Sequence, residues 1–303
     1  MLQYKCRNYI NSLKNAIFFI YFAIYISREM YYNKADKKIR SNVLFIMKEI
    51  GLNLYSVRNL IGTEEELITT AQKLKDMGYS FFQYSGATFD PKRIKRMVDE
   101  VGTPVRLTHM DKDRLLNETE KVCEENLYFG NTNIGLGAMS AEVINDEKMC
   151  KEYIEKYNKA GEIMRKYGCQ FYWHHHNFEF IQYNGQTVMD FVIDNAPYIN
   201  FTLDTYWLQL GGMNVIEYLE RLSGRIGCVH LKDFKTRYNT EIWKYEPEIE
   251  SVGYGVMNFQ SIINKMREVG VQYYFVEQDN AADKPDTLHQ VERSIQYLKK
   301  EIK

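Results

Sequence analysis

Histidine and carboxylate side chains recur at the ends of short apolar segments in the second half of this 303-residue sequence. A histidine triplet occupies positions 174–176, and Asp204, His230 and Glu277 each close a later segment rich in aromatic and β-branched residues. Imidazole and carboxylate ligands without a thiolate suit Mn²⁺, Mg²⁺, Co²⁺, Fe²⁺ or Zn²⁺. If the segments end at one edge of a sheet, the pattern predicts one divalent metal with positions left for a hydroxy-carbonyl substrate.

Each of these side chains also has a purely structural interpretation. Strand alternation puts the first and third histidines of the triplet on one face and His175 on the other, toward surrounding helices. A lone histidine such as His109 is more often a hydrogen-bonded structural residue than a ligand. Asp204 could equally cap a helix, Glu277 could be a solvated loop carboxylate, and His230 could belong to a polar strand end. Four such groups on consecutive strands are a stronger indication of a site than any one alone.

The elements that would position these groups are visible from residue 49 onward. Apolar segments rich in β-branched and aromatic residues predict strands at 49–57, 80–85, 104–110, 132–138, 170–177, 199–207, 226–233 and 272–279. Amphipathic segments predict helices at 63–77, 90–101, 111–127, 145–167, 187–196, 214–224, 258–269 and 285–302. Strict alternation requires a parallel sheet with right-handed crossovers. Eight units in about 257 residues predict a single (β/α)8 TIM barrel, whose active site lies at the carboxyl ends of the strands. An open doubly wound sheet is less favoured, because no glycine-rich phosphate turn follows the first strand.

The first 46 residues differ in charge from the rest of the chain. They hold eight Lys or Arg and two acids, which is +6, whereas the remaining residues hold 31 Lys or Arg and 38 acids, which is −7. We expect residues 1–46 to be an N-terminal extension from an over-extended start, with Met47 as the natural start and the barrel at 47–303. A secretory leader and a functional helical appendage are the alternatives.

The overall composition excludes several classes of protein. The net charge of −1 gives no basic excess of the kind that nucleic-acid binders show. The apolar run 16–26 is too short to cross a bilayer, which needs about 20 residues. The five cysteines form no CxxC pair, which favours a reduced, cytoplasmic protein. We therefore expect neither a nucleic-acid nor a membrane partner.

Six motifs together give the chain a resemblance to a known superfamily. They are IGLNLYSVR (50–58), WHHHNFEF (173–180), LDTYW (203–207), VHLKD (229–233), VGYG (252–255) and FVEQD (275–279). In this order they resemble the xylose isomerase-like TIM barrels, which include sugar phosphate isomerases/epimerases and inosose dehydratase. The resemblance runs from about Lys48 to the end of the chain and does not specify a substrate.

The resemblance implies a metal site and a ligand set. In such proteins a Glu, an Asp, a His and a second Glu from strands five to eight hold one divalent metal, and the last three correspond to Asp204, His230 and Glu277. At the first position this chain has His174 instead of Glu. The implied set is therefore two imidazoles and two carboxylates.

The same departure bears on catalysis. In ketose epimerases the two glutamates also act as acid and base on opposite faces of the substrate, so here Glu277 would act with His176 or Glu179 opposite it. The metal would polarise a carbonyl, a base would remove the neighbouring proton, and an enediolate would result. Reprotonation gives an isomer or epimer, whereas loss of a β-hydroxyl gives a dehydration product.

Several further residues are candidates for binding the substrate. Trp207 either fills packing space or stacks on a sugar face, and His109, Lys232 and Arg58 are the polar candidates. Asp233 is a candidate to orient a metal-bound imidazole. The long segment 235–254 lies at the catalytic end, where it would form a lid or a contact in a homo-oligomer.

We therefore expect a metal-dependent isomerase or epimerase that acts on a small sugar, sugar phosphate or keto-sugar. A lyase of the inosose dehydratase type is the main alternative. A DNA-repair endonuclease shares the barrel but needs several metals and a basic groove, and a catalytically silent sugar-binding protein is the remaining alternative.

Overall fold

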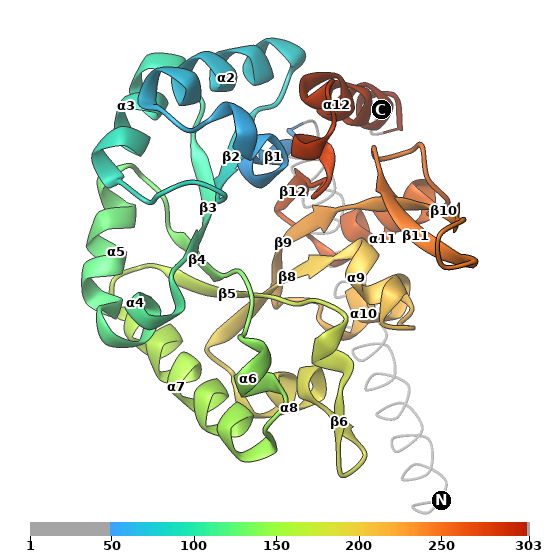
Figure 1. Cartoon of the computed structure of the whole chain (residues 1–303). Coiled ribbons are helices and arrows are strands. Elements are labelled where there is room, and N and C mark those ends of the chain that lie inside the picture. The colour runs from blue at the N-terminus through green and yellow to red at the C-terminus, as the bar shows by residue number, and fades with distance from the viewer. Residues whose placement is uncertain (1–48, 302–303) are drawn as a thin grey trace, which may run out of the picture. The chain divides into compact units, whose positions relative to one another are not determined.

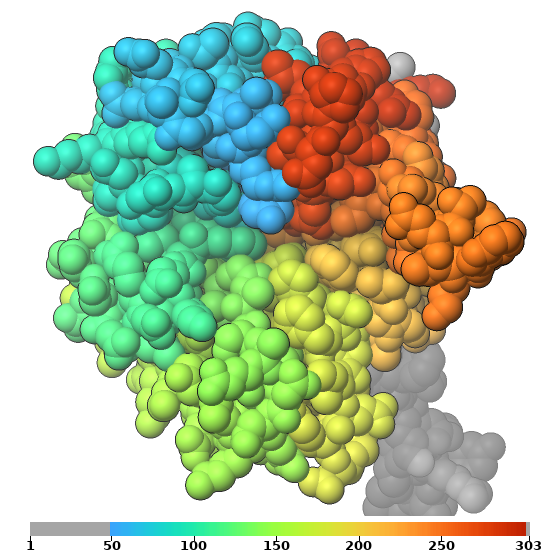
Figure 2. Space-filling model, viewed as in Figure 1, coloured from blue at the N-terminus to red at the C-terminus, as the bar shows by residue number. Residues whose placement is uncertain are grey.

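Eight short apolar segments pair side by side as parallel strands and close into a barrel (Figure 1). The structure is a computed structural model that describes residues 49–301. Its barrel strands are β1 (Gly51–Asn53), β2 (Phe81–Tyr84), β3 (Val105–Met110), β4 (Asn133–Leu136), β5 (Gln170–His174), β8 (Ile199–Asp204), β9 (Ile226–Leu231) and β12 (Tyr273–Val276). Pairing of β1 with β12 closes the ring, so the blue start and red end of the described chain lie side by side in Figure 2. The predicted (β/α)8 barrel is confirmed, whereas the expectations for residues 1–46 and Met47 lie outside the described residues.

Helices follow the strands and surround the barrel. They are α2 (Glu64–Met77), α3 (Pro91–Val101), α4 (Lys112–Asn117), α5 (Thr119–Tyr128), α6 (Ala141–Ile144), α7 (Glu147–Lys166), α8 (Val188–Asn195), α9 (Thr205–Leu210), α10 (Val215–Arg221), α11 (Phe259–Val269) and α12 (Thr287–Glu301). Thr63 and Glu66 form a reciprocal capping box at the start of α2. The helix expected at 111–127 is interrupted at Glu118, which separates α4 from α5. None of the helices in the described part of the chain is long and apolar enough to span a bilayer.

Most strands end earlier than their composition predicts, and three of them lead directly into turns near the site. The first was expected to reach residue 57 but ends at Asn53, and the 3-10 helix η1 (Leu54–Leu60) follows. The fifth and sixth end at His174 and Asp204 rather than at 177 and 207. Asn53 and Asp204 explain two of these ends, because each side chain accepts backbone N–H groups of the turn that follows. Trp207 consequently lies in helix α9 and not on a strand.

Large side chains fill the interior of the barrel. A buried cluster comprises Phe81, Leu107, Tyr172, Cys228 and Phe275, contributed by five different strands. The rings of Phe81 and Phe275 meet edge to face with centroids 5.1 Å apart. A Cβ atom at Gly51 would lie 2.2 Å from the Phe81 ring, so glycine is required at this point of β1. The packed interior leaves the carboxyl ends of the strands for chemistry.

Two antiparallel hairpins extend from the loops. The larger pairs β10 (Asp233–Asn239) with β11 (Lys244–Glu250) and occupies most of the long segment expected to be a lid or a contact. It protrudes as the orange lobe in Figure 2. The smaller hairpin pairs β6 (Gln182–Tyr183) with β7 (Gln186–Thr187) and was not expected from the sequence.

Candidate functional site

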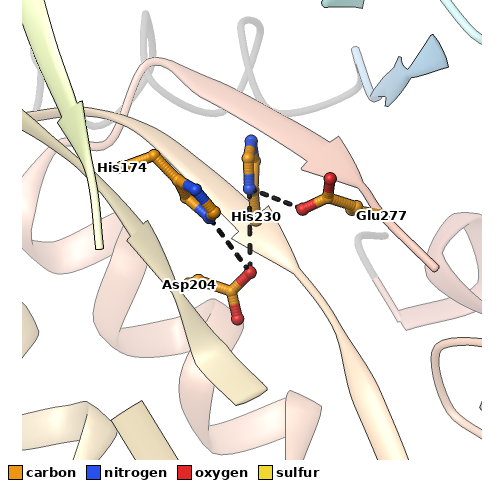
Figure 3. Close-up of side chains that lie close together, drawn as sticks. All are labelled: His174, Asp204, His230 and Glu277. Atoms are coloured by element: carbon orange, nitrogen blue, oxygen red, sulfur yellow. Dashed lines mark hydrogen bonds and ion pairs between the residues drawn. The ribbon is translucent and has the colours of Figure 1, made fainter. Parts of the chain in front are cut away.

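Four side chains from successive strands converge at one end of the barrel (Figure 3). His174 ends β5, Asp204 ends β8, His230 lies on β9 and Glu277 directly follows β12. We call these four residues the ligand cluster. One ligand atom from each lies within 4.8 Å of all the others, and all four residues are buried. Asp204 Oδ2 is 3.5 Å from His174 Nε2 and 3.7 Å from His230 Nδ1, and His230 Nδ1 is 2.8 Å from Glu277 Oε2.

The contacts around the two imidazoles suit a divalent ion. His174 Nδ1 is 2.8 Å from the Gly137 carbonyl oxygen, and His230 Nε2 is 2.6 Å from Gln83 Oε1. An acceptor on one ring nitrogen fixes the tautomer and leaves the other nitrogen as a ligand. His230 Nδ1 and Glu277 Oε2 make no hydrogen bond despite their close approach. Neighbouring ligands of an octahedral ion lie about 3 Å apart when each bond is about 2.1 Å, so this pair has nearly the spacing of two ligands of one metal.

Lys232 provides a positive charge beside the cluster. Its ammonium lies 3.1 Å from Asp204 Oδ2 and 3.0 Å from both Glu277 Oε2 and Asp279 Oδ2. Burial opposes the charge, but these carboxylates outweigh burial and hold the pKa of Lys232 well above its usual range. The carboxylates of Asp204, Glu277 and Asp279 and the ammonium of Lys232 together carry a formal charge of −2. A divalent cation would neutralise this remainder.

Electrostatics also set the ionisation of the cluster itself. Burial opposes ionisation of Asp204 and Glu277, but Lys232 and the histidines hold the pKa of both carboxyls well below the usual range. Burial likewise opposes the charge on His230, but Glu277 and Asp204 raise its pKa to about 9. A metal at this position would therefore displace a proton from His230.

Two amide side chains support the cluster and were missed by the sequence analysis. Gln83 on β2 contacts His230 through Oε1, and its Nε2 lies 3.0 Å from His109 Nε2. Asn53 on β1 donates to Glu277 Oε1 at 2.7 Å and accepts from Ser85 Oγ at 2.5 Å. The available indication was a polar residue inside or at the end of an otherwise apolar strand.

A cavity of about 580 Å³ opens beside the cluster. It is lined by Tyr55, Ser85, Gly86, His109, Gly137, His174, His176, Trp207, Lys232, Ile249, Glu277 and Asp279. Six residues expected in the site are among these: His109, His174, His176, Trp207, Lys232 and Glu277. Ile249 comes from hairpin β10–β11, so this hairpin forms part of the cavity wall. Arg58 and Glu179 do not line the cavity.

Each histidine of the triplet has a different set of contacts. His174 belongs to the ligand cluster, and His176 lines the cavity. His175 is buried, and its Nε2 accepts from the backbone N–H of Asp204 at 3.1 Å. It was expected to face the helices, and its hydrogen bond holds the chain at a cluster residue. Burial, with a contribution from His174, lowers the pKa of His176 to about 2, so this ring is uncharged at neutral pH.

Glu179 and Arg58 contact residues that hold or line the cavity but do not line it themselves. Glu179 is fully buried, and burial raises its pKa to about 8. Its carboxyl group accepts hydrogen bonds from the His176 backbone N–H at 2.7 Å and from Trp173 Nε1 at 3.4 Å. Arg58 donates to the carbonyl oxygen of Asp279 at 2.6 Å and pairs with Asp283 at 3.0 Å. Glu179 thus positions the chain at His176, and Arg58 joins the loops after β1 and β12.

Asp233 does not orient His230, and that expectation is wrong. Its Oδ2 accepts from the N–H groups of Gly253 and Gly255 at 3.0 Å. Its Oδ1 accepts from those of Phe234 and Met257 at 2.8 and 3.2 Å. Asp233 therefore anchors the base of hairpin β10–β11, and Gln83 is the residue that contacts His230.

Comparisons with known proteins support the same fold. The sequence profile of the family described as xylose isomerase-like TIM barrel matches residues 71–301. Over 102 residues the chain is 29% identical to inosose dehydratase of Clostridium perfringens (strain 13 / Type A), covering 33% of each protein. That alignment spans about a third of the length of the curated relatives it matches.

Two solved structures share this architecture. A sugar phosphate isomerase/epimerase from Parabacteroides distasonis ATCC 8503 superposes with a TM-score of 0.68 at 22% identity, covering 84% of this chain and 95% of that one. A xylose isomerase-like TIM barrel protein from Mycobacterium smegmatis in complex with magnesium superposes with a TM-score of 0.63 at 14% identity, covering 84% and 96%. At these identities the superpositions show a common fold. Because the family profile covers most of the described barrel, the chain belongs to the xylose isomerase-like TIM barrel family.

Proposed function

We propose that this protein is a metal-dependent isomerase or epimerase of a small sugar, sugar phosphate or keto-sugar. The convergence of four metal-compatible ligand atoms within 4.8 Å beside a 580 Å³ cavity carries the proposal. Its position at the carboxyl ends of the strands is where enzymes of this fold keep their active sites. A divalent ion held by the ligand cluster would act as a Lewis acid that polarises a substrate carbonyl and acidifies the adjacent C–H bond.

Glu277 is our candidate for the base that removes this proton. It lines the cavity, and Asn53 holds its Oε1 at 2.7 Å, which fixes the carboxylate in one orientation. A positioned carboxylate next to a polarised carbonyl is the arrangement that general-base catalysis requires. The product of this step on the substrate is an enediolate.

His176 is our candidate for the opposing group. Glu179 holds its backbone N–H, and its ring stacks on Phe178 with centroids 4.8 Å apart and 10° between the planes. The uncharged ring is suited to hydrogen-bond a substrate hydroxyl or carbonyl. Trp207, with its ring centroid 5.1 Å from that of His176, offers an apolar face to the sugar. We assign His109 to substrate binding because it lines the cavity. Lys232 also lines the cavity, and we assign it to holding the carboxylates that face the substrate.

A lyase of the inosose dehydratase type is the second candidate. The partial match to inosose dehydratase and the histidine in place of the first family glutamate favour it. The first step would be the same proton abstraction, and loss of a β-hydroxyl would replace reprotonation.

Deuterium exchange tests both candidates. Protein loaded with Mn²⁺ or Co²⁺ is incubated in D₂O with a panel of aldoses, ketoses, inososes and the phosphate esters of the sugars, and the reaction is followed by NMR. An isomerase or epimerase incorporates deuterium next to the carbonyl and forms an isomer, whereas a lyase forms a dehydrated product. Asp204→Asn should abolish exchange and metal retention, and Asp99→Asn, the same change on α3, should alter neither. Metal-loaded protein without exchange or product across the panel would refute the proposal.

A further inference from the structure

The described residues that line the cavity are neutral or acidic apart from Lys232, and none of them offers a free cation. Tyr55, Ser85 and Trp207 are neutral, and the carboxyl groups of Glu277 and Asp279 are also at the wall. Among the lining residues of the described chain, Lys232 is the one that carries a permanent positive charge, and it is 1% exposed. Its ammonium is committed to three carboxylates at 3.0–3.1 Å.

Cations near the rim are likewise paired with acids or carbonyl groups. Arg58 binds the Asp279 carbonyl oxygen and the Asp283 carboxylate. Lys235 lies 2.7 Å from Glu250, on the same hairpin as Ile249 of the cavity wall. These groups balance local acids and add no net positive field at the cavity mouth.

The usual anion position of this fold is acidic here. TIM barrels that bind phosphate often do so with the loops after strands seven and eight and the start of a short extra helix. In this chain the loop after β12 carries Asp279, Asp283 and Asp286 around the three-residue η3 (Ala281–Asp283), and the lysine of this loop, Lys284, lies 3.8 Å from Glu248. The loop after β9 is hairpin β10–β11. A phosphate group at this position would meet carboxylates.

We propose that the substrate of this cavity is an uncharged polyhydroxy carbonyl compound and that its phosphate esters are excluded. The inference rests on the proposed function and narrows its substrate class. A divalent ion would cancel the −2 of the three carboxylates and Lys232, which leaves no excess positive charge to pair with a phosphate dianion. Hydroxyl groups have partners in Ser85 and Asp279, and the indole of Trp207 accommodates the C–H face of a sugar. The cavity volume of about 580 Å³ lies within the range of small-ligand pockets.

Matched pairs of sugars measure this selectivity directly. The full-length, Mn²⁺-loaded protein is freed of unbound metal and titrated calorimetrically with ketopentoses and ketohexoses and with the terminal phosphate ester of each. We expect at least one free sugar to bind at least about tenfold more tightly than its ester at low ionic strength, where charge repulsion is weakly screened. An ester that binds as tightly as its free partner, or a panel in which no free sugar binds, would overturn the inference.

A substitution tests whether charge causes the exclusion. Asp279→Asn removes a carboxylate at nearly constant volume and should reduce the preference for the free sugar several-fold. Asp99→Asn on α3 is the matched control and should leave the preference unchanged. An unchanged preference in Asp279→Asn would overturn the charge argument.

Deuterium exchange separates the two proposals. If neither the free sugars nor their phosphate esters exchange deuterium, the proposed reaction fails, while the binding ratios still decide the substrate class. If only the phosphate esters exchange, the reaction stands and the uncharged substrate class is wrong.

Discussion

Asp204 serves the helix and the site through different oxygens. Its Oδ1 accepts the backbone N–H groups of Tyr206 and Trp207 at 2.9 and 3.0 Å and so caps α9. Its Oδ2 faces the histidines and Lys232. The structure confirms the capping role, and because a carboxylate has two acceptors, Oδ2 stays free for the proposed role as a metal ligand.

At the same scale, Gln83 should set metal affinity without being a ligand. Gln83→Met removes the acceptor of His230 Nε2–H and frees the ring to rotate. We expect the affinity for Mn²⁺ to fall about 10- to 100-fold, the usual cost of losing such a partner. A Mn²⁺ titration followed by EPR measures this fall. Gln72→Met on the exposed face of α2 is the control, and equal affinity in Gln83→Met and wild type would contradict the assignment.

The turn after β5 is an element held by one buried carboxyl group. Glu179 accepts from the His176 backbone and from Trp173, so it fixes the path by which the chain leaves the strand. No short-range sequence pattern predicts that Glu179 holds the backbone here, because a glutamate after a histidine triplet is equally suited to face the cavity.

Glu179 should make stability depend on pH. Burial raises its folded-state pKa to about 8 from the ordinary 4.5, so the folded protein holds this proton more tightly than the unfolded chain. The protonated Glu179 therefore contributes to the free energy of unfolding. This contribution is fully present below about pH 4.5 and falls by ~1.4 kcal/mol for each pH unit as the pH rises toward 8. Urea unfolding of Glu179→Gln between pH 5 and 8.5 should show a gain over wild type that grows with pH. Glu155→Gln, at an exposed position of α7, is the control, and its unfolding free energy should depend on pH as that of wild type does. The same pH dependence in Glu179→Gln and wild type would disprove the effect.

The base of hairpin β10–β11 is a second element that depends on one side chain. Asp233→Asn leaves a single acceptor oxygen for four N–H groups, so we expect a loss of about 2–4 kcal/mol in unfolding free energy. Urea unfolding and a Mn²⁺ titration on the same variant measure stability and metal affinity. The affinity should change little, because Asp233 does not contact His230. A large loss of affinity without a loss of stability would restore the interpretation that Asp233 orients the imidazole.

For the whole molecule, the ligand cluster ties together four strands of a closed barrel. Binding to the folded state alone stabilises it by about 2.7 kcal/mol when the metal concentration is 100 times the Kd. In a domain of this size that corresponds to a rise in Tm of roughly 5–11 °C. Differential scanning calorimetry with Mn²⁺, reversed by EDTA, measures the rise. Asp204→Asn should show no such rise, and a wild-type Tm that is indifferent to metal would contradict a metal site.

The order of elements and the location of the chemistry follow from the sequence alone. Eight alternating strand and helix segments favour a closed parallel barrel, and in that topology the carboxyl ends of all strands lie at one face. The histidine triplet, Asp204, His230 and Glu277 could therefore be grouped without knowing any distance, whereas the choice of His174 within the triplet came from the family resemblance. Local composition failed at the strand ends, because it does not show where Asn53 and Asp204 begin to cap the next turn.

The tertiary structure decided which groups touch. Gln83 reaches His230 across 147 positions of sequence and Asn53 reaches Glu277 across 224, contacts that exist only because the barrel closes. The same closure commits Lys232 to three carboxylates and joins Arg58 to the loop after β12. Periodicity along a chain specifies the face on which a side chain emerges, whereas its partner depends on the register between strands and on packing at atomic distances.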